Sequence, residues 1–395
     1  MQIESIEIKN FRVFRHVRIE DLPSLCVLVG ANGTGKSTLF EVFSFLKDAL
    51  SMDVGKAISK RGGYRELASR GHEEEPIELT LQFRMPITGR NRLVTYELVV
   101  INERGRAVIK REVLRYKRGR YGAPFHFLEF SHGSGFAITN EEDFSKQDEE
   151  LEREYQDLDS PDILAVKGLG QFERFKAASA FRHDIENWHI SDFHISDARP
   201  SQEDGIAEHL STRGDNLALV ASYMYEHEPE AFQNVLDAMR NRVPGIDVIE
   251  PKQTEDGRLI LRFRDGSFKD PFLARYVSDG TIKMFAYLIL LNDPKPFPML
   301  AVEEPENQLY PELLAELAEE FRDYARRGGQ VFISTHSPDF LNALQLDEIY
   351  CLRKNDEGFT DIKRANSSAN LVSLFEQGDL PGYLWKQGLF EGLNR

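Results

Sequence analysis

Alternating apolar and polar residues predict a strand-rich first third of the chain. Residues 3–8 alternate like a half-buried strand, and a second strand is expected at 16–19. Three longer alternating segments follow, with Gly89 and Gly105 in the loops between them, so an antiparallel meander is expected. These segments cover 76–85, 92–101 and 106–116. A further strand is expected at 125–130, whereas residues 57–71 contain glycine breakers and are expected to be irregular.

The later part of the chain changes from alternation to helical periodicity. Helices are expected over 161–188 and 217–242, and from residue 271 onward helices alternate with short apolar strands. The expected helix–strand pairs are 281–291 with 298–302, and 311–327 with 330–334. This pattern predicts an α/β fold with an antiparallel meander and a mainly helical insertion. The expected domains are 1–140, the insertion 141–245, and 246–395.

Length and composition are those of a globular protein. The 395 residues are enough for one large or two to three smaller structural units, and no apolar run approaches the ~20 residues that a membrane helix needs. Cys26 and Cys351 offer no disulfide framework, and each is expected to pack as a small hydrophobe inside a strand. The N-terminus lacks the apolar core of a signal peptide, so a cytoplasmic location without membrane contact is expected.

Charge is unevenly distributed along this chain of net charge −16. Residues 84–120 are rich in arginine and lysine, whereas residues 141–159 are strongly acidic. The basic stretch could lie along a DNA backbone, because phosphate contacts require clustered cations more than a fixed spacing. Equally, it could be a solvated sheet face that pairs with the acidic run of the same or a neighbouring chain. The sequence leaves both readings open.

One stretch near the start predicts a nucleotide site. It follows the apolar run 25–29, precedes a helical pattern, and fits G-x-x-x-x-G-K-[ST]. Its residues are Gly30, Ala31, Asn32, Gly33, Thr34, Gly35, Lys36, Ser37 and Thr38. A strand, a glycine loop and a helix N-terminus direct backbone N–H groups at a polyphosphate. We expect Lys36 to reach the β- and γ-phosphates of ATP and the Ser37 hydroxyl to be a ligand of Mg²⁺.

Three later segments carry chemistry of the same kind. The apolar strand 299–302 ends in two carboxylates: Glu303 can hold magnesium, directly or through water, and Glu304 can deprotonate the attacking water. Ser278 and Gly280 stand at the start of a helix, which forms an anion-binding N-terminus. His336 follows the next apolar strand, at the end where α/β sites are built.

Together these segments, in this order, resemble the ATP-binding-cassette ATPases of the RecF/SMC/Rad50-like type. The stretches 276–281, 303–307 and 334–338 look especially like the bacterial "AAA-15" ATPases related to the Overcoming-Lysogenization-Defect nucleases. The resemblance is specific for residues 1–50 and 271–355. It implies that residues 30–38 are Walker A, that Ser278 and Gly280 belong to the signature, and that an ABC-type P-loop core surrounds them.

The resemblance also implies roles for single residues. Glu303 takes the Walker B acidic position, where the family usually has aspartate; Glu304 is the catalytic base, and His336 is the switch histidine. Residues 306–307 lie where a D-loop would be, and Arg12 lies where related ATPases place residues near the nucleotide. We could not place a Q-loop; Gln82 is only a candidate.

In this family the signature of one subunit completes the site of another. The resemblance therefore implies a homodimer or a higher even oligomer that sandwiches ATP. Nuclease relatives append a Toprim domain after the switch histidine, and the chain continues only to residue 395, so no intrinsic nuclease is expected.

Three functions are compatible with the sequence. The first is an ATPase switch that controls a separately encoded effector or responds to DNA, with antiviral defence as a context that the resemblance suggests. The second is a RecF-like DNA-repair ATPase. The third is a scaffold in which the nucleotide only holds an interface.

Overall fold

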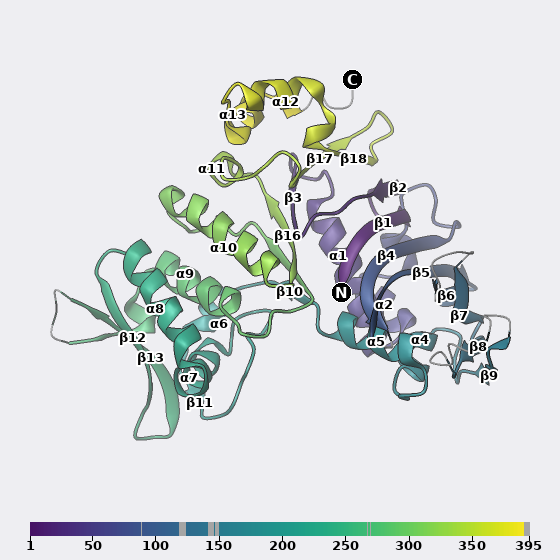
Figure 1. Ribbon diagram of the computed structural model, residues 1–395, viewed down its shortest axis with the longest axis horizontal. Coiled ribbons are helices and arrows are strands. Elements are labelled where there is room, and N and C mark those ends of the chain that lie inside the picture. Colours follow the sequence, from purple (N-terminus) through teal and green to yellow (C-terminus); the bar gives the residue numbers. More distant parts are fainter. Residues whose placement is uncertain are drawn as a thin grey trace. The chain divides into compact units, whose positions relative to one another are not determined.

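The computed structural model describes residues 1–87, 89–117, 124–140, 146, 150–266, 268 and 270–390 (Figure 1). The chain forms two compact units. The first comprises Met1–Trp188, Asp347–Ala369 and the C-terminal residues from Phe390; the second comprises His189–Leu346 and Asn370–Leu389. Among the described residues, no helix is long and apolar enough to cross a membrane.

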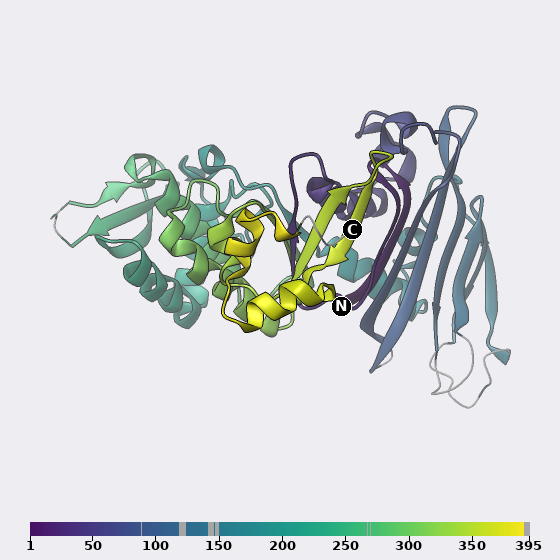
Figure 2. The same ribbon diagram turned by 90° about the horizontal axis from the view of Figure 1, so that it is seen from above.

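An eight-stranded antiparallel sheet forms much of the first unit, in the order β2-β1-β4-β5-β6-β7-β8-β9. Its strands are β1 (Gln2–Phe11), β2 (Phe14–Ile19), β4 (Ile77–Ile87), β5 (Arg90–Glu103), β6 (Arg106–Tyr116), β7 (Phe125–Ser131), β8 (Ser134–Ile138) and β9 (Arg153–Asp157). Figure 2 shows the blue strands of this sheet side by side. The predicted meander is confirmed, and β8 and β9 extend it beyond the strands that the sequence indicated.

The alternation along β4 and β5 explains why helices pack on this sheet. Leu81 and Phe83 are buried on one face of β4, in register with Tyr96 and Val94 of β5. Helix α5 (Lys176–Glu186) covers that face: the Phe181 ring stacks on the Phe83 ring with centroids 5.0 Å apart. Strand β4 and helix α5 therefore pack in one core, although they are far apart in the sequence.

A second group of strands in the first unit leads into the glycine loop. It consists of β3 (Leu25–Val29), β17 (Ile349–Lys354) and β18 (Thr360–Arg364), and helix α1 (Lys36–Ser51) follows the loop. Every residue of β3 is buried, as its apolar sequence predicts, and β3 runs parallel to β17. Cys26 and Cys351 are free and buried within β3 and β17, so their predicted role as strand hydrophobes is confirmed.

The expectation of irregular structure over 57–71 was wrong in part. Two short helices, α2 (Val54–Ser59) and α3 (Tyr64–Leu67), lie there, and Gly62 and Gly63 separate them. The Asp53 side chain accepts a 2.6 Å hydrogen bond from the Lys56 N–H and caps α2. The glycines thus end one helix and begin the next rather than prevent helices altogether.

The second unit contains three parallel strands with helices α9, α10 and α11. The strands are β10 (His189–Ser191), β15 (Met299–Glu303) and β16 (Gln330–Thr335). The helices are α9 (Asp279–Leu291), α10 (Leu314–Arg326) and α11 (Pro338–Leu341). Helix α10 leads from β15 to β16 and helix α11 follows β16, which confirms the expected alternation of helices and strands.

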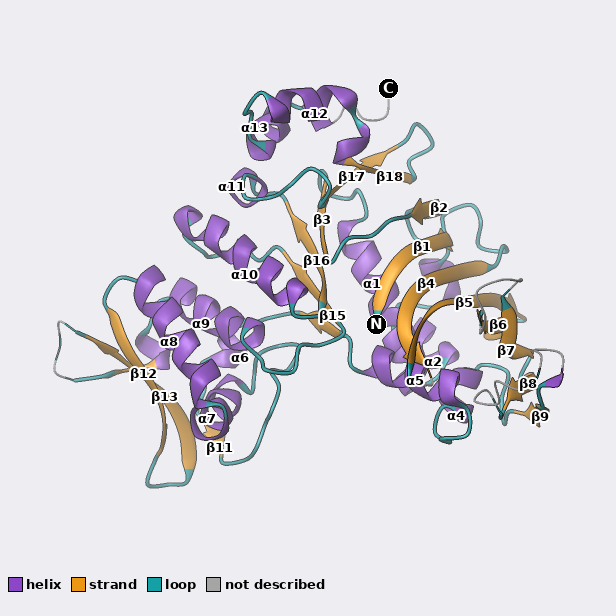
Figure 3. Ribbon diagram, viewed as in Figure 1, coloured by secondary structure: helices purple, strands orange, loops and turns teal. Residues whose placement is uncertain are grey.

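The remainder of the second unit is mixed (Figure 3). It contains helices α6 (Ile195–Ala198), α7 (Leu217–His227), α8 (Pro229–Arg242), α12 (Ala369–Glu376) and α13 (Pro381–Lys386), and strands β11 (Gln202–Glu203), β12 (Ile246–Gln253), β13 (Arg258–Asp265) and β14 (Phe272–Leu273). The single helix expected over 217–242 is broken before Pro229. Proline has no N–H to donate and disfavours a helical residue before it, and Glu228 is accordingly non-helical (φ −129°, ψ 56°).

The two compact units do not end at the predicted domain boundaries. The expected insertion 141–245 is divided: its described residues up to Trp188, including α4 (Ala165–Leu169) and α5, group with the first unit, and those from His189 group with the second. The physical reason is the packing of α4 and α5 on the meander and on α1, which a local pattern of helical periodicity does not reveal.

Candidate nucleotide site

The glycine loop connects the buried strand β3 to helix α1 in the first unit. Gly35 is the N-cap of α1 in a left-handed conformation (φ 102°), and Gly33 is also left-handed (φ 77°). A side chain at Gly35 would be strained and would come within 2.8 Å of the Val13 side chain. Residues 31–33 are exposed, as a loop that meets a ligand requires. The loop therefore turns through left-handed glycines, as the sequence predicted.

Lys36 turns its side chain back onto the glycine loop. Its side chain is buried, and Nζ donates to the carbonyl oxygens of Gly30 at 2.7 Å and Ala31 at 3.3 Å. Ser37 is exposed in the first turn of α1, whereas Thr38 is buried. An ammonium and a hydroxyl thus stand at the N-terminus of a 16-residue helix, a kind of position that suits an anion. That these residues bind a polyphosphate stays a prediction.

The neighbouring hairpin β17–β18 lies against the loop. The Thr360 hydroxyl of β18 donates to the Thr34 carbonyl at 2.8 Å, and a Cβ at Gly30 would lie 2.5 Å from the Leu352 carbonyl of β17. Sequence reasoning missed both contacts, because they join segments more than 300 positions apart.

Arg12 lies in the turn between β1 and β2 with φ 49°, and its guanidinium pairs with Glu41 of α1. The Nη2–Oε1 distance is 2.6 Å. The structure thus places Arg12 beside the Walker A helix, but bonded to a carboxylate of that helix. Gln82, the Q-loop candidate, accepts a 3.2 Å hydrogen bond from the Ser5 hydroxyl within the meander.

The predicted catalytic carboxylates lie in the second unit, at the end of β15. Glu303 is the last residue of the strand and is exposed. Glu304 follows with φ 43°, and its N–H donates to the Ser334 carbonyl of β16 at 2.8 Å. A left-handed residue without glycine is uncommon and costs energy, so surrounding contacts must hold it. Such strain often accompanies a functional site.

Those contacts converge on the Glu304 carboxylate. Oε1 lies 3.2 Å from Nδ1 of His336, and Oε2 accepts a 2.9 Å hydrogen bond from the Asn307 amide. The Asn307 N–H also donates to the Glu304 carbonyl at 3.1 Å. The structure therefore brings together Glu304 and His336, which the sequence selected separately.

Glu306 supports this pair, and sequence reasoning placed it only in the D-loop. Its buried Oε1 accepts from the Thr335 hydroxyl at 2.7 Å and from the His336 N–H at 3.0 Å. Oε2 of Glu306 is buried without a hydrogen-bond partner. Glu306 thus holds the backbone at His336.

The signature residues begin α9 in the same unit. Ser278 is the N-cap, and its Oγ accepts from the Thr281 N–H at 3.3 Å. A Cβ at Gly280 would lie 2.8 Å from the Gln308 carbonyl, so the helix start lies directly against the D-loop. Ser278 and Gly280 line a hollow of about 630 Å³ together with Gln308 and Tyr310.

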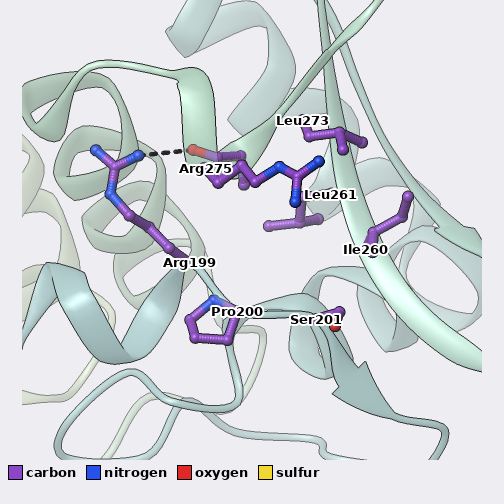
Figure 4. Close-up of a pocket in the computed structure, with 8 residues that line it drawn as sticks. Arg199, Pro200, Ser201, Ile260, Leu261, Leu273 and Arg275 are labelled. Atoms are coloured by element: carbon purple, nitrogen blue, oxygen red, sulfur yellow. Dashed lines mark hydrogen bonds between the residues drawn. The ribbon is translucent and has the colours of Figure 1, made fainter.

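Arg199 braces this helix start from the segment after α6. Its guanidinium donates to the Ala274 carbonyl at 2.8 Å (Figure 4). It also pairs with the carboxylate of Asp279, the first residue of α9. A neighbouring hollow of about 380 Å³ contains Arg199 and Arg275 among its lining residues. No sequence signal pointed to Arg199, because its contacts are formed only in the folded chain.

Three arginines of the basic stretch 84–120 form ion pairs within the meander. Arg111 pairs with Glu97 and Glu129 at 3.3 Å, Arg115 pairs with Glu97, and Arg84 pairs with Glu4. These partners lie on neighbouring strands and not in the acidic run. Residues 118–120 of the stretch, and 141–145 and 147–149 of the acidic run, lie outside the described residues. Contact of this stretch with DNA stays a prediction.

Comparison with known proteins gives the wider context. A family model described as "AAA domain, putative AbiEii toxin, Type IV TA system" matches residues 25–342, which is most of the chain. The chain belongs to this family. The matched range spans the glycine loop 30–38, Ser278, Gly280, Glu303, Glu304 and His336.

A curated relative agrees with this family assignment. The DNA replication and repair protein RecF of Heliobacterium modesticaldum is 31% identical over 87 residues, which are 21% of this chain and 23% of RecF. The match thus spans about a quarter of that relative's length. It supports a P-loop ATPase of the RecF/SMC type.

Solved structures show the same fold. An SMC head bound to the C-terminal winged-helix domain of ScpA matches with a TM-score of 0.52 at 14% identity, over 92% of this chain and 97% of that chain. An Smc head domain with an extended coiled coil, bound to the C-terminal domain of ScpA derived from Pyrococcus furiosus, matches with a TM-score of 0.50 at 14% identity, over 95% and 99%. The predicted α/β ABC-type fold with its meander is confirmed.

Proposed function

We propose that this family member is an ATP-hydrolysing molecular switch. ATP binds on the loop Gly30–Thr38, and hydrolysis yields ADP and phosphate. The observation that carries the proposal is the 3.2 Å approach of Glu304 Oε1 to His336 Nδ1 at the ends of the neighbouring strands β15 and β16. A carboxylate and a histidine so placed are suited to position and deprotonate a water molecule.

The chain's own groups account for the chemistry. Glu304 accepts a proton from the water as the water oxygen bonds to the γ-phosphorus, and the bond to the bridging oxygen of ADP breaks. His336 holds the carboxylate and senses the γ-phosphate, while Glu306 holds the His336 N–H. Lys36 binds the phosphates with a charge-assisted contact.

The residues present also fit a magnesium ion. Ser37 and Glu303 are both exposed and supply a hydroxyl and a carboxylate oxygen, the ligand types that Mg²⁺ prefers. When bound, Mg²⁺ would neutralise charge on the β- and γ-phosphates. Walker A lies in the first unit and Glu303, Glu304 and His336 in the second, so their meeting around one nucleotide is part of the proposal.

Two copies of the chain are proposed to bind head to tail. The chain has one P-loop and one signature, and the hollow beside Ser278 and Gly280 offers a helix N-terminus to an anion. We propose that it receives the phosphate end of the nucleotide held by the second copy, in a homodimer or higher even oligomer. ATP binding would then close the assembly, and hydrolysis would release it.

The biological task is proposed to lie in a separately encoded effector. The family description mentions a toxin and a toxin–antitoxin system, which supports a switch that controls such an effector, with antiviral defence as one context. No residue of this chain is proposed as a nuclease.

The test is light scattering on Glu304→Gln protein with and without ATP·Mg²⁺, together with ATP turnover of both this variant and the unaltered chain. The variant keeps the shape of the site and removes the base. ATP should therefore double the mass of the variant, and the variant should turn over ATP about 100-fold or more slowly than the unaltered chain. Glu226→Gln, an exposed change in α7, is the matched control. A mass independent of nucleotide would contradict the switch and favour a fixed scaffold.

A RecF-like DNA-binding ATPase is the second candidate, and the match to RecF favours it. It predicts that ATP-trapped Glu304→Gln protein binds duplex DNA and that binding weakens steeply with salt. Neutralising Arg104 and Arg106 at the β5–β6 turn should then weaken binding. A DNA affinity that is the same with and without ATP would contradict this candidate.

A further inference from the structure

Lys283 is a buried cation next to the proposed catalytic carboxylate. It lies one turn into α9 with 6% of its surface exposed, and Nζ donates to the Asn307 carbonyl at 2.7 Å. Nζ also lies 5.6 Å from the centroid of the Tyr287 ring. Lysine is rarely buried this deeply, because its ammonium loses most of its hydration.

Burial changes the pKa of the Lys283 ammonium. It lowers the pKa of Lys283 to about 8, because desolvation disfavours the ammonium more than the negative charges of Glu306 and Glu304 favour it. Burial of a charged group costs free energy, so a buried lysine calls for a specific explanation. A perturbed group beside a reacting carboxylate instead suggests a role in the reaction.

The contacts form a continuous connection from the signature helix to His336. Lys283 of α9 holds the Asn307 carbonyl, and the Asn307 amide holds Glu304 Oε2 at 2.9 Å. Glu304 Oε1 in turn lies 3.2 Å from His336 Nδ1. At the other side of the same helix start, Gly280 lies against the Gln308 carbonyl. Two points of α9 therefore fix the backbone segment that positions Glu304.

We propose that Lys283 is a positioning residue of the ATPase reaction, which holds the Asn307 backbone so that Glu304 is oriented for the attacking water. This inference rests on the proposed ATPase function. It adds that α9, which carries the signature at its N-terminus, is connected through Lys283 and Asn307 to the general base of the same chain. Binding of a phosphate at the signature would then change the orientation of the Glu304 carboxylate.

Lys283 also contributes charge to this cluster. The charges that act on its ammonium are those of Glu306 and Glu304, and the Tyr287 ring of its own helix lies beside it. Loss of the ammonium therefore removes both the donor to the Asn307 carbonyl and a positive charge near the two carboxylates.

The test compares full-length Lys283→Met and Lys283→Arg with the unaltered protein. Methionine keeps the length of the side chain and removes the charge and the donor. We expect kcat to fall by about 10- to 100-fold with ATP affinity changed less than about threefold, since only positioning is lost. Lys283→Arg keeps the charge and a donor, so it should recover most of the kcat that Lys283→Met loses.

Lys47→Met is the matched control. Lys47 of α1 is also partly buried, and its ammonium donates to a backbone carbonyl, that of Trp188. This change removes the same kind of contact outside the connection and should leave both kcat and ATP affinity unchanged.

Asn307→Ala keeps the test decisive if Lys283→Met fails to fold, because Asn307 is exposed. It breaks the next contact in the connection and should lower kcat similarly, and the double variant should lose little more than either single one. An unchanged kcat in folded Lys283→Met or in Asn307→Ala, or fully multiplicative losses, would overturn the inference. Failure of the ATPase proposal is seen separately, as absence of turnover in the unaltered protein or full turnover in Glu304→Gln.

Discussion

Glu304 and His336 meet because their strands are neighbours. β15 and β16 are parallel with Glu303 opposite Ser334, so the residues that follow each strand emerge at the same edge. The result is the 3.2 Å separation between Glu304 Oε1 and His336 Nδ1. The carboxylate is half-buried and its backbone is left-handed, so its orientation depends on its partners.

Replacement of His336 tests that dependence. We expect His336→Ala to lower kcat for ATP by about 100-fold and to leave ATP binding nearly intact, because the imidazole positions the Glu304 carboxylate. Steady-state turnover and equilibrium binding of a fluorescent ATP analogue would measure the two effects. A large loss of binding with unchanged kcat would assign His336 to nucleotide binding.

The Walker A residues should behave in the opposite way. Lys36→Ala removes the only side-chain cation within the loop 30–38, and we expect ATP affinity to fall by about 100-fold. Calorimetric titration with ATP·Mg²⁺ would measure the loss. The fold should persist, because the Lys36 ammonium donates to the carbonyl oxygens of Gly30 and Ala31, both within the loop.

Arg12 provides a graded comparison. Because its guanidinium is paired with Glu41, we expect Arg12→Ala to reduce ATP affinity less than about threefold and stability by less than about 1 kcal/mol. The same titration and thermal unfolding would check both values. An affinity loss as large as that of Lys36→Ala would show that Arg12 leaves Glu41 for the phosphates.

The sequence predicted those parts of the molecule that local patterns determine. The buried strand β3, the glycine loop and α1 follow from composition and spacing, and the meander follows from alternation. Glu304 and His336 were found because each follows an apolar strand. The two compact units, in contrast, depend on which surfaces pack together, and no local pattern places α5 on the meander.

The supporting residues of the site could not be predicted for the same reason. Glu306, Lys283 and Arg199 acquire their roles through contacts with residues 24 to 80 positions away. In the sequence each is an ordinary charged residue of a loop or a helix. Only burial and hydrogen-bond geometry distinguish them from the many exposed charges of this chain.

Glu306 should be important for stability as well as for the site. Glu306→Ala leaves the buried Thr335 hydroxyl and the His336 N–H without their acceptor, so we expect a loss of about 1–3 kcal/mol in the free energy of unfolding. Urea unfolding would measure it. Glu226→Ala, at an exposed position of α7, should change stability by less than about 0.5 kcal/mol. Equal effects of the two changes would contradict the role given to Glu306.

The last prediction concerns Glu112 of β6, which is fully buried in the first unit. Its carboxylate accepts from the N–H groups of Ala165 and Val166 at the start of α4 and from the Tyr96 hydroxyl at 3.0 Å. Burial raises the pKa of Glu112 to about 7, and the three hydrogen bonds oppose that rise. The folded chain therefore holds this proton more tightly than the unfolded chain, in which the value is about 4.5.

The sign of the pH dependence follows from linkage. Where the native state binds more protons than the unfolded state, stability falls as pH rises. The contribution of Glu112 is thus full below about pH 4.5 and lost as pH rises through about 7, with an upper bound of about 3 kcal/mol.

Glu112→Gln cannot ionise and isolates this contribution. Between pH 5 and 8, the unfolding free energy of the unaltered chain should fall relative to that of Glu112→Gln. Urea unfolding of both proteins at several pH values would measure the difference. A constant difference across this range would mean that Glu112 keeps one ionisation state throughout, and that the three donors outweigh its burial.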